Sequence, residues 1–185
     1  MSKWKLFFTS LFLTTGVLLT EMYLNRRPVP KIPVLEQITG KIFITSQLAP
    51  KDVLYVRGRG IKTIVDMRPD GEVDGQPSSE EISSTAAKID IGFHYIPVPH
   101  ESIPESAVEE LHQVLSKEAT PALLYCRTGR RAVRLFALEE ASRAEGPDAA
   151  AIQEMVRKAG FSADDLKEDI NRRISHRSDS QPIKQ

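Results

Sequence analysis

The chain has 185 residues, which is enough for one domain of ordinary size with additional segments at its ends. Its 25 basic and 25 acidic residues give a formal net charge of zero, which argues against a protein whose main task is to bind nucleic acid. The single cysteine excludes a disulfide within the chain and a zinc site built on several thiolates. Any chemistry of Cys126 is therefore the chemistry of one thiol.

An apolar segment covers residues 6–24 and follows Lys3 and Lys5. Its length just reaches the roughly 20 residues that span a bilayer, and no small-residue cleavage site stands near Thr20. We therefore predict that residues 1–24 form a single-pass N-terminal membrane anchor, with a cleaved signal segment or a soluble helix as alternatives. Basic residues flank the segment on both sides, so the positive-inside rule does not assign the side of the membrane on which the domain lies.

Prolines at positions 28, 30 and 33 exclude a regular helix over residues 25–38 and predict a stiff, extended linker. The folded domain is expected over residues 39–175. Residues 176–185 are polar and are expected to be disordered.

Within the domain, short apolar and β-branched runs alternate with amphipathic stretches. The expected strands are 41–45, 61–67, 93–98 and 121–125. The expected helices are 50–59, 78–89, 105–117, 131–144, 147–160 and 162–174, with caps at Ser78 (capping-box spacing to Glu81) and Ser102. This alternation predicts an α/β fold with a central, mostly parallel sheet flanked by helices.

The segment Cys126-Arg127-Thr128-Gly129-Arg130-Arg131, called the Cys loop below, stands between an expected strand and an expected helix. Parallel sheets bind ligands at the carboxyl ends of their strands, and Cys126 follows such an end. The backbone N–H groups of a turn and of a helix start favour an anion and a thiolate. Gly129 permits a tight turn.

This arrangement predicts an ionised sulfur nucleophile beside a cradle for an oxyanion, which suits thiol-based phosphoryl transfer or sulfur transfer. We expect Arg127, Thr128, Gly129, Arg130 and Arg131 to contribute to anion binding, with Thr128 also able to hydrogen-bond the thiolate. The alternative is that Cys126 is a small core residue, but three neighbouring arginines at a strand end are hard to explain as core.

Residues 41–140 resemble the phosphatase-like domain of the beta-lactamase hydrolase-like protein family, which has a dual-specificity-phosphatase-like fold. The resemblance is carried by residues 44–48 (ITSQL), 60–72 (GIKTIVDMRPDGE), 93–98 (FHYIPV) and the Cys loop. It implies a cysteine-dependent hydrolase of phosphate esters, in which Cys126 is the nucleophile and Arg131 clamps the phosphate.

One feature departs from the tyrosine and dual-specificity phosphatases, which place five residues between the cysteine and the arginine. Here that position is Ala132, and Arg131 comes one residue earlier. The pattern Cys-Arg-x-Gly-x-Arg resembles the short loop of rhodanese sulfurtransferases. Sulfur transfer through a persulfide on Cys126 is therefore an alternative, and a non-catalytic anion-binding module is a third.

A phosphatase also needs a general acid that protonates the leaving oxygen. Residues 98–102 contain no aspartate, so His100 and Glu101 are the candidates there, against a reading as a solvated loop. Asp70 and Glu72 follow another strand end and could reach the site, although Asp70-Gly71 also suits a turn. We predict an anionic substrate, no metal and no cofactor.

Overall fold

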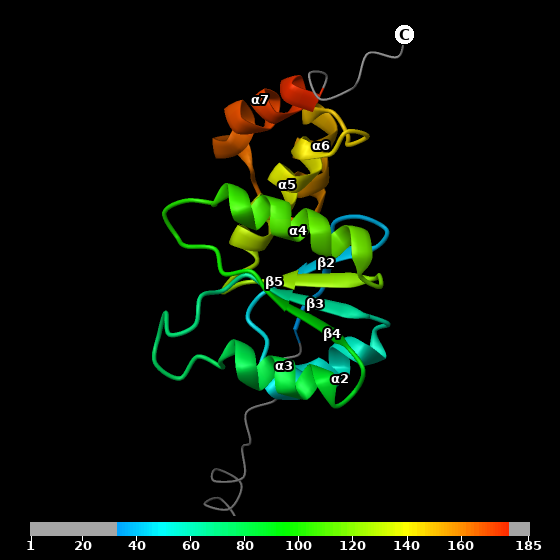
Figure 1. Ribbon diagram of the computed structural model, residues 1–185, viewed down its shortest axis with the longest axis vertical. Helices are drawn as coiled ribbons and strands as arrows, with labels where there is room; N and C mark the ends of the chain where they lie inside the picture. The colour runs from blue at the N-terminus through cyan, green and yellow to red at the C-terminus, as the bar shows by residue number, and fades with distance from the viewer. Residues whose placement is uncertain (1–32, 178–185) are drawn as a thin grey trace, which may run out of the picture. The chain divides into compact units, whose positions relative to one another are not determined.

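The computed structural model describes residues 33–177, and its centre is a five-stranded sheet in the order β1-β2-β5-β3-β4 (Figure 1). The strands are β1 (Glu36–Gln37), β2 (Ile42–Thr45), β3 (Thr63–Asp66), β4 (Gly92–Tyr95) and β5 (Ala122–Tyr125). β2, β5, β3 and β4 pair in parallel, and only β1 is antiparallel to its neighbour. The predicted α/β fold with a mostly parallel sheet is confirmed.

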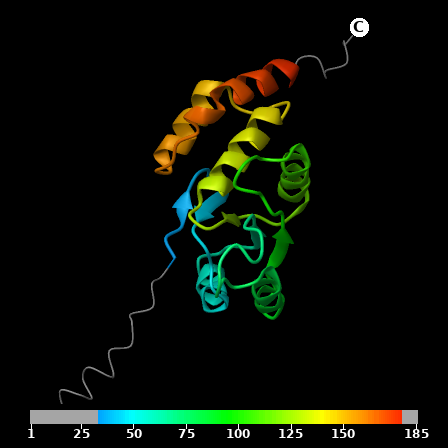
Figure 2. The ribbon, with the colours of Figure 1, turned by 90° about the vertical axis from the view of Figure 1, so that its left-hand side faces the viewer.

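Helices cover both faces of the sheet. They are α2 (Pro50–Gly58), α3 (Ser79–Ala87), α4 (Glu105–Lys117), α5 (Arg130–Ser142), α6 (Ala149–Lys158), the 3-10 helix η1 (Asp164–Leu166) and α7 (Lys167–Arg177). α2 and α3 lie on one face, and α4 and α5 lie on the other (Figure 1). α6 and α7 pack against α5 and form a further layer on that side (Figure 2).

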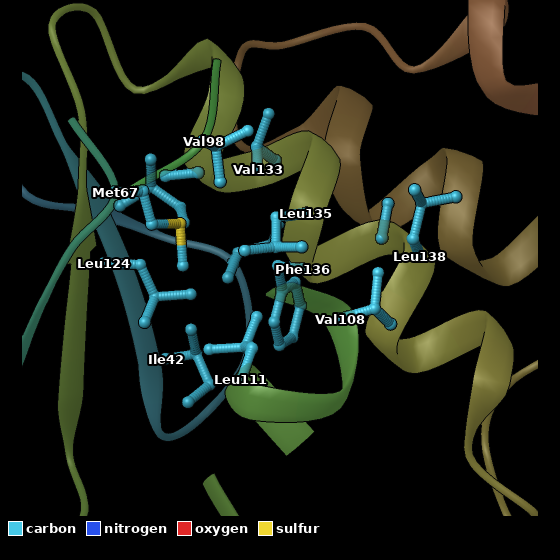
Figure 3. Packing of buried hydrophobic residues seen from close by; sticks show 14 of the residues in the cluster. Ile42, Met67, Val98, Val108, Leu111, Leu124, Val133, Leu135, Phe136 and Leu138 are labelled. Atoms are coloured by element: carbon cyan, nitrogen blue, oxygen red, sulfur yellow. The ribbon is translucent and has the colours of Figure 1, made fainter. Parts of the chain in front are cut away.

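The central strand β5 is buried on both faces, which explains its continuous apolar sequence. Because side chains alternate along a strand, Leu124 and Cys126 join the core under α4 and α5, while Leu123 and Tyr125 join the core under α2 and α3. Figure 3 shows Leu124 in the first of these cores, together with residues of α4 and α5. Cys126 is therefore held at the end of the most buried strand.

The first residues of α3 and α4 can be compared with the predicted helix caps. The capping box at the start of α3 is confirmed, because Ser78 N donates to Glu81 Oε2 (2.8 Å) and Glu81 N donates to Ser78 Oγ (3.2 Å). The predicted cap at Ser102 is wrong. Pro104 is the N-cap of α4 and makes no side-chain cap, so Ser102 lies two residues too early to reach the first turn.

The N-terminal boundary of the domain lies earlier than predicted. Glu36 and Gln37 pair with β2, and Ile38 is only 7% exposed, so the end of the predicted linker over residues 25–38 belongs to the domain. The predicted anchor over residues 1–24 lies outside the described residues. Between residues 33 and 177, no helix is long and apolar enough to cross a membrane.

The C-terminal boundary lies later than predicted. His176 and Arg177 are the last residues of α7, so a disordered tail that begins at residue 176 is wrong for these two positions. Arg177 donates hydrogen bonds to the carbonyl oxygens of Ala141 (2.7 Å) and Gly146 (2.9 Å). Ala141 lies in the last turn of α5 and Gly146 follows it, where helix carbonyls lack partners within the helix. These hydrogen bonds tie the end of α7 to the end of α5.

Candidate active site

The Cys loop joins the end of β5 to the start of α5. Gln47 N, just after β2, donates to Arg127 O of the loop (3.3 Å), and Met67 N, just after β3, donates to Tyr125 O at the end of β5 (2.9 Å). Cys126 is 1% exposed. The first N–H groups of α5, which follow it in the chain, have no partner within the helix and favour an anion.

Gly129 is the N-cap of α5 and has a left-handed backbone conformation, with φ +86°. A Cβ at this position would lie 2.9 Å from Phe161 Cζ and 3.1 Å from Ile44 Cγ2. The position thus excludes a side chain for two independent reasons, the backbone conformation and the lack of space.

Arg131 points from the first turn of α5 toward Glu72, which lies 59 residues earlier in the chain. Its Nη1 donates to Glu72 Oε1 (2.5 Å) and to Val98 O (2.6 Å), and its Nη2 donates to Glu72 Oε2 (2.9 Å). A guanidinium has five N–H groups, so Nε–H and one Nη2–H are not used by Glu72 or Val98. These two lie along one edge of the plane, which is the fork that a second oxyanion can accept.

The charge of Arg131 also acts on Cys126. Burial alone would lower the pKa of Arg131, but its hydrogen bonds to Glu72 and its interactions with the nearby Cys126 outweigh burial, and the net pKa is raised. Arg131 thus lies close to Cys126 as well as to Glu72.

Glu72 contacts Arg131, Arg68 and His100. Besides Arg131, its carboxylate accepts a hydrogen bond from Arg68 Nε (2.8 Å) and lies 3.4 Å from His100 Nε2. The hydrogen bonds from Arg131 are the main reason that the pKa of Glu72 falls to about 2, and Arg68 adds to the effect while burial opposes it. Glu72 is therefore ionised at any pH at which the protein would work.

Arg68 is supported by the strand ends below it. Its Nη1 donates to Gln47 Oε1 (2.8 Å), and its backbone N–H donates to Asp66 Oδ1 (2.9 Å). Burial raises the pKa of Asp66 to about 6, although the Tyr125 hydroxyl and the Arg68 N–H oppose this rise. Arg68, and Arg131 through Glu72, are thus supported by a buried polar cluster at the carboxyl ends of β2, β3 and β5.

The predicted anion-binding residues of the Cys loop divide into two groups. Arg127, Thr128 and Arg130 are exposed, whereas Gly129 and Arg131 are buried. The exposed arginines can attract an anion to the loop, while the buried Arg131 has a fixed orientation.

The remaining predicted residues lie in different surroundings. His100 is 60% exposed and lies beside Glu72. Glu101 is exposed and makes no hydrogen bond or ion pair with another described residue. Asp70 is directed away from Arg131, because its carboxylate accepts from Ser79 N (2.8 Å) and Ser79 Oγ (2.7 Å). Glu72, two residues later, is the acid of this loop that contacts Arg131.

Sequence reasoning assigned no role to Arg68, Gln47 or Phe161. Arg68 and Gln47 each follow a strand that ends at the same edge as β5, which is a signal that could have found them. No local pattern points to Phe161. Within residues 33–177 there is no group of three or more His, Cys, Asp or Glu side chains that could hold a metal ion.

Comparison with known proteins places these features in a family. Residues 34–144 match the family model described as the phosphatase-like domain of beta-lactamase hydrolase-like protein. The chain belongs to this family. The match contains the sheet, the Cys loop and α5, and it confirms the resemblance drawn from the sequence.

Curated members of the family are longer than this chain. Beta-lactamase hydrolase-like proteins from Agrobacterium fabrum and Xylella fastidiosa are 30% and 27% identical to it over 105 and 103 residues. These matches cover 57% and 56% of this chain but only 24% of each relative. The chain thus corresponds to about a quarter of the length of these relatives.

Solved phosphatase structures share the fold. A candidate phosphatase from Neisseria meningitidis is 30% identical, with a TM-score of 0.65 over 74% of this chain and 96% of that chain. The core catalytic domain of the PP-IP phosphatase Siw14 from S. cerevisiae, solved in complex with citrate, has a TM-score of 0.58 at 16% identity and covers 78% of this chain and 88% of its own. The phosphatase-like domain therefore has the fold of phosphatase enzymes.

Proposed function

We propose that this domain is a cysteine-dependent phosphatase that hydrolyses phosphate esters. The observation that carries the proposal is the position of Arg131, which interacts with Cys126 and has two N–H groups on one edge that neither Glu72 nor Val98 uses. Family membership supports a phosphatase-type hydrolase, and the Cys loop supplies the donors that a phosphoryl group requires.

In the proposed reaction the Cys126 thiolate attacks phosphorus and the bond to the leaving oxygen breaks. This yields a phosphocysteine and an alcohol, whose oxygen takes a proton from His100, Glu101 or water. Water then attacks the phosphocysteine, which releases inorganic phosphate and restores the thiolate. The Nε/Nη2 edge of Arg131 and the loop N–H groups bind the equatorial oxygens, where charge builds up in the transition state.

Glu72 has a positioning role in this mechanism. It binds the Nη1/Nη2 edge of the guanidinium, beside the Nε/Nη2 edge, and it is fixed in turn by Arg68. Arg131 is therefore oriented before the substrate arrives, which lowers the reorganisation needed in the transition state.

The test is a steady-state assay with an aryl phosphate on wild type, Cys126→Ser and Arg131→Lys. We expect Cys126→Ser to be inactive and Arg131→Lys to lose roughly a hundredfold to a thousandfold in kcat, since one fixed oxyanion donor contributes about that much. Thr128→Ser is the matched control in the same loop, because it keeps the hydroxyl. Undiminished turnover by Cys126→Ser would contradict the mechanism.

Sulfur transfer is the second candidate, and the short loop favours it. With four residues between Cys126 and Arg131, the cradle is smaller than that of a tyrosine phosphatase and suits a sulfane sulfur. Cys126 would take the outer sulfur of thiosulfate to form a persulfide and release sulfite, and cyanide would remove this sulfur as thiocyanate. A protein that gains one sulfur atom in mass and makes thiocyanate, without releasing phosphate, would favour this function. Tight binding of phosphate without either turnover would favour a non-catalytic anion-binding module.

A further inference from the structure

Residues 145–177, called the C-terminal unit below, lie beyond the match to the family model, which ends at residue 144. They form α6, η1 and α7, which pack along α5 (Figure 2). We propose that the C-terminal unit braces the Cys loop and that Phe161 is the positioning residue through which it acts. The inference rests on the proposed function only in taking the Cys loop as the anion-binding site.

Phe161 follows α6 and contacts the Cys loop at Gly129. Its ring atoms Cζ and Cε1 lie 2.9 and 3.2 Å from the place of a Cβ at Gly129, and Ile44 Cγ2 of β2 lies 3.1 Å from the same point. Gly129 is thus held between β2 and the Phe161 ring. Because Gly129 is the N-cap of α5, its orientation sets the direction of the first N–H groups of the helix.

The turn that carries Phe161 is itself fixed. Phe161 N donates to Val156 O (3.1 Å), and Gln153 Nε2 donates to Ala163 O (3.0 Å), which ties the turn to α6. An ion pair between Arg134 and Asp165 (2.5 Å) ties it to α5. Phe161 is also partly buried against the core under α5. The backbone of the turn thus holds Phe161 beside Gly129.

The C-terminal unit also contacts the other side of the site. Arg173 of α7 donates to Glu105 Oε1 (2.8 Å), at the first residue of α4, and to Ser142 Oγ (3.0 Å). The segment directly before Glu105 contains Val98, whose carbonyl oxygen accepts from Arg131, and His100. One structural unit thus holds both the loop that would bind the anion and the segment that carries a candidate acid.

Removing any buried aromatic side chain lowers stability. If Phe161 supports the Cys loop, its removal should have a further effect on the loop. Donors aimed at an oxyanion are effective only when their directions are fixed beforehand. Removal of the ring should therefore loosen the loop N–H groups before it disturbs the sheet. Phe93 of β4 is a matched control, because it is also partly buried but packs against the core on the opposite face.

The experiment compares Phe161→Ala, Phe161→Leu and Phe93→Ala with wild type, all as the full chain. Amide hydrogen exchange over residues 127–131 is measured together with aryl phosphate kinetics and the inhibition constant of inorganic phosphate. We expect Phe161→Ala to speed exchange in the loop by about tenfold or more. It should raise KM and the phosphate inhibition constant, and lower kcat/KM by roughly tenfold to a hundredfold.

Phe161→Leu should stay much closer to wild type in all three measurements, because a leucine still fills most of the space beside Gly129. Phe93→Ala should lower the melting temperature but leave loop exchange and the phosphate inhibition constant unchanged. Equal loop exchange in Phe161→Ala and wild type, or equal acceleration in Phe93→Ala, would overturn the brace. If Phe161→Ala does not fold, Phe161→Val takes its place, because valine is too short to fill the space beside Gly129, and loop exchange in that variant no faster than in wild type overturns the brace.

The outcome for the brace is separable from that for the proposed function. A wild-type protein without Cys126-dependent phosphate release would contradict the phosphatase. Loop exchange in the presence and absence of inorganic phosphate would still decide whether Phe161 supports the anion-binding loop.

Discussion

The Glu72 carboxylate and the Arg131 guanidinium face each other through two hydrogen bonds, of 2.5 and 2.9 Å. One residue comes from the loop after β3 and the other from the first turn of α5. Their pairing holds the side chain of Arg131 beside Cys126 and leaves two N–H groups on the Nε/Nη2 edge of the guanidinium that Glu72 does not use. Glu72 Oε2 also accepts a hydrogen bond from Arg68 Nε (2.8 Å), so the charge of Glu72 is shared by two buried arginines.

Replacing Glu72 with glutamine should impair catalysis more than folding. The amide side chain keeps one acceptor oxygen but loses the charge, so we expect kcat/KM for an aryl phosphate to fall roughly tenfold to a hundredfold, because Arg131 is then poorly oriented. Asp74→Asn, in the exposed part of the same loop, should behave as wild type. A kcat/KM for Glu72→Gln within twofold of that for Asp74→Asn would show that Arg131 needs no such partner.

The same pair predicts a pH dependence of stability. The pKa of Glu72 lies near 2 in the folded protein, against an ordinary 4.5. Its contribution to the free energy of unfolding is therefore complete above pH 4.5 and is lost as pH falls toward 2. The free energy of unfolding should be about 1–3 kcal/mol lower in Glu72→Gln than in wild type near neutral pH, as for hydrogen bonds to charged groups. Urea unfolding at pH 7 and pH 3 checks whether this difference shrinks.

Asp66→Asn should have the opposite pH dependence. Since burial raises the pKa of Asp66 to about 6 from 3.8, the folded state holds the proton between these values while the unfolded state releases it. Wild-type stability therefore falls as pH rises through this range and then levels off. We expect Asp66→Asn to be more stable than wild type by about 1–3 kcal/mol at pH 8 and to lose this advantage toward pH 4. If Asp66→Asn is less stable than wild type at pH 8, the ionised carboxylate of Asp66 stabilises the folded protein.

His100 and Glu101 can be separated as candidates for the general acid. His100 lies 3.4 Å from Glu72, next to Arg131, whereas Glu101 has no such contact. We expect His100→Asn to lower kcat by about tenfold to a hundredfold for a poor leaving group and much less for an activated aryl phosphate, because general acids commonly contribute at least that much. Glu101→Gln should leave both rates unchanged. The reverse pattern would assign the acid to Glu101.

Gly129→Ala should cost more stability than another substitution at a glycine with positive φ. Gly75 has φ +72° and nothing within 4 Å of its Cβ position, so Gly75→Ala meets only the backbone cost of about 1 kcal/mol. At Gly129 the same cost is joined by the clash with Phe161 and Ile44, and overpacking adds roughly 1–3 kcal/mol. Equal losses in urea unfolding would mean that the Phe161 ring moves aside without resistance.

The sequence alone predicts those parts of the site that neighbouring residues determine. The strand over residues 121–125 is recognised by its apolar run, and the next helix by its periodicity, so the position of Cys126 between them follows from local pattern. The capping box at Ser78 and Glu81 is local in the same sense, because both partners lie within one helical turn. Interactions within a few residues depend on the geometry of one element, which the sequence encodes directly.

Only the tertiary structure decides between Asp70 and Glu72. Both follow the same strand, and both are acids, yet one binds Ser79 and the other binds Arg131. The choice depends on the strand order β2-β5-β3, which places the loop after β3 beside the start of α5. Phe161 reaches Gly129 for the same kind of reason, because α6 folds back along α5. Such contacts join residues far apart in the chain, and their energy depends on distances that exist only once the sheet and its helices have packed.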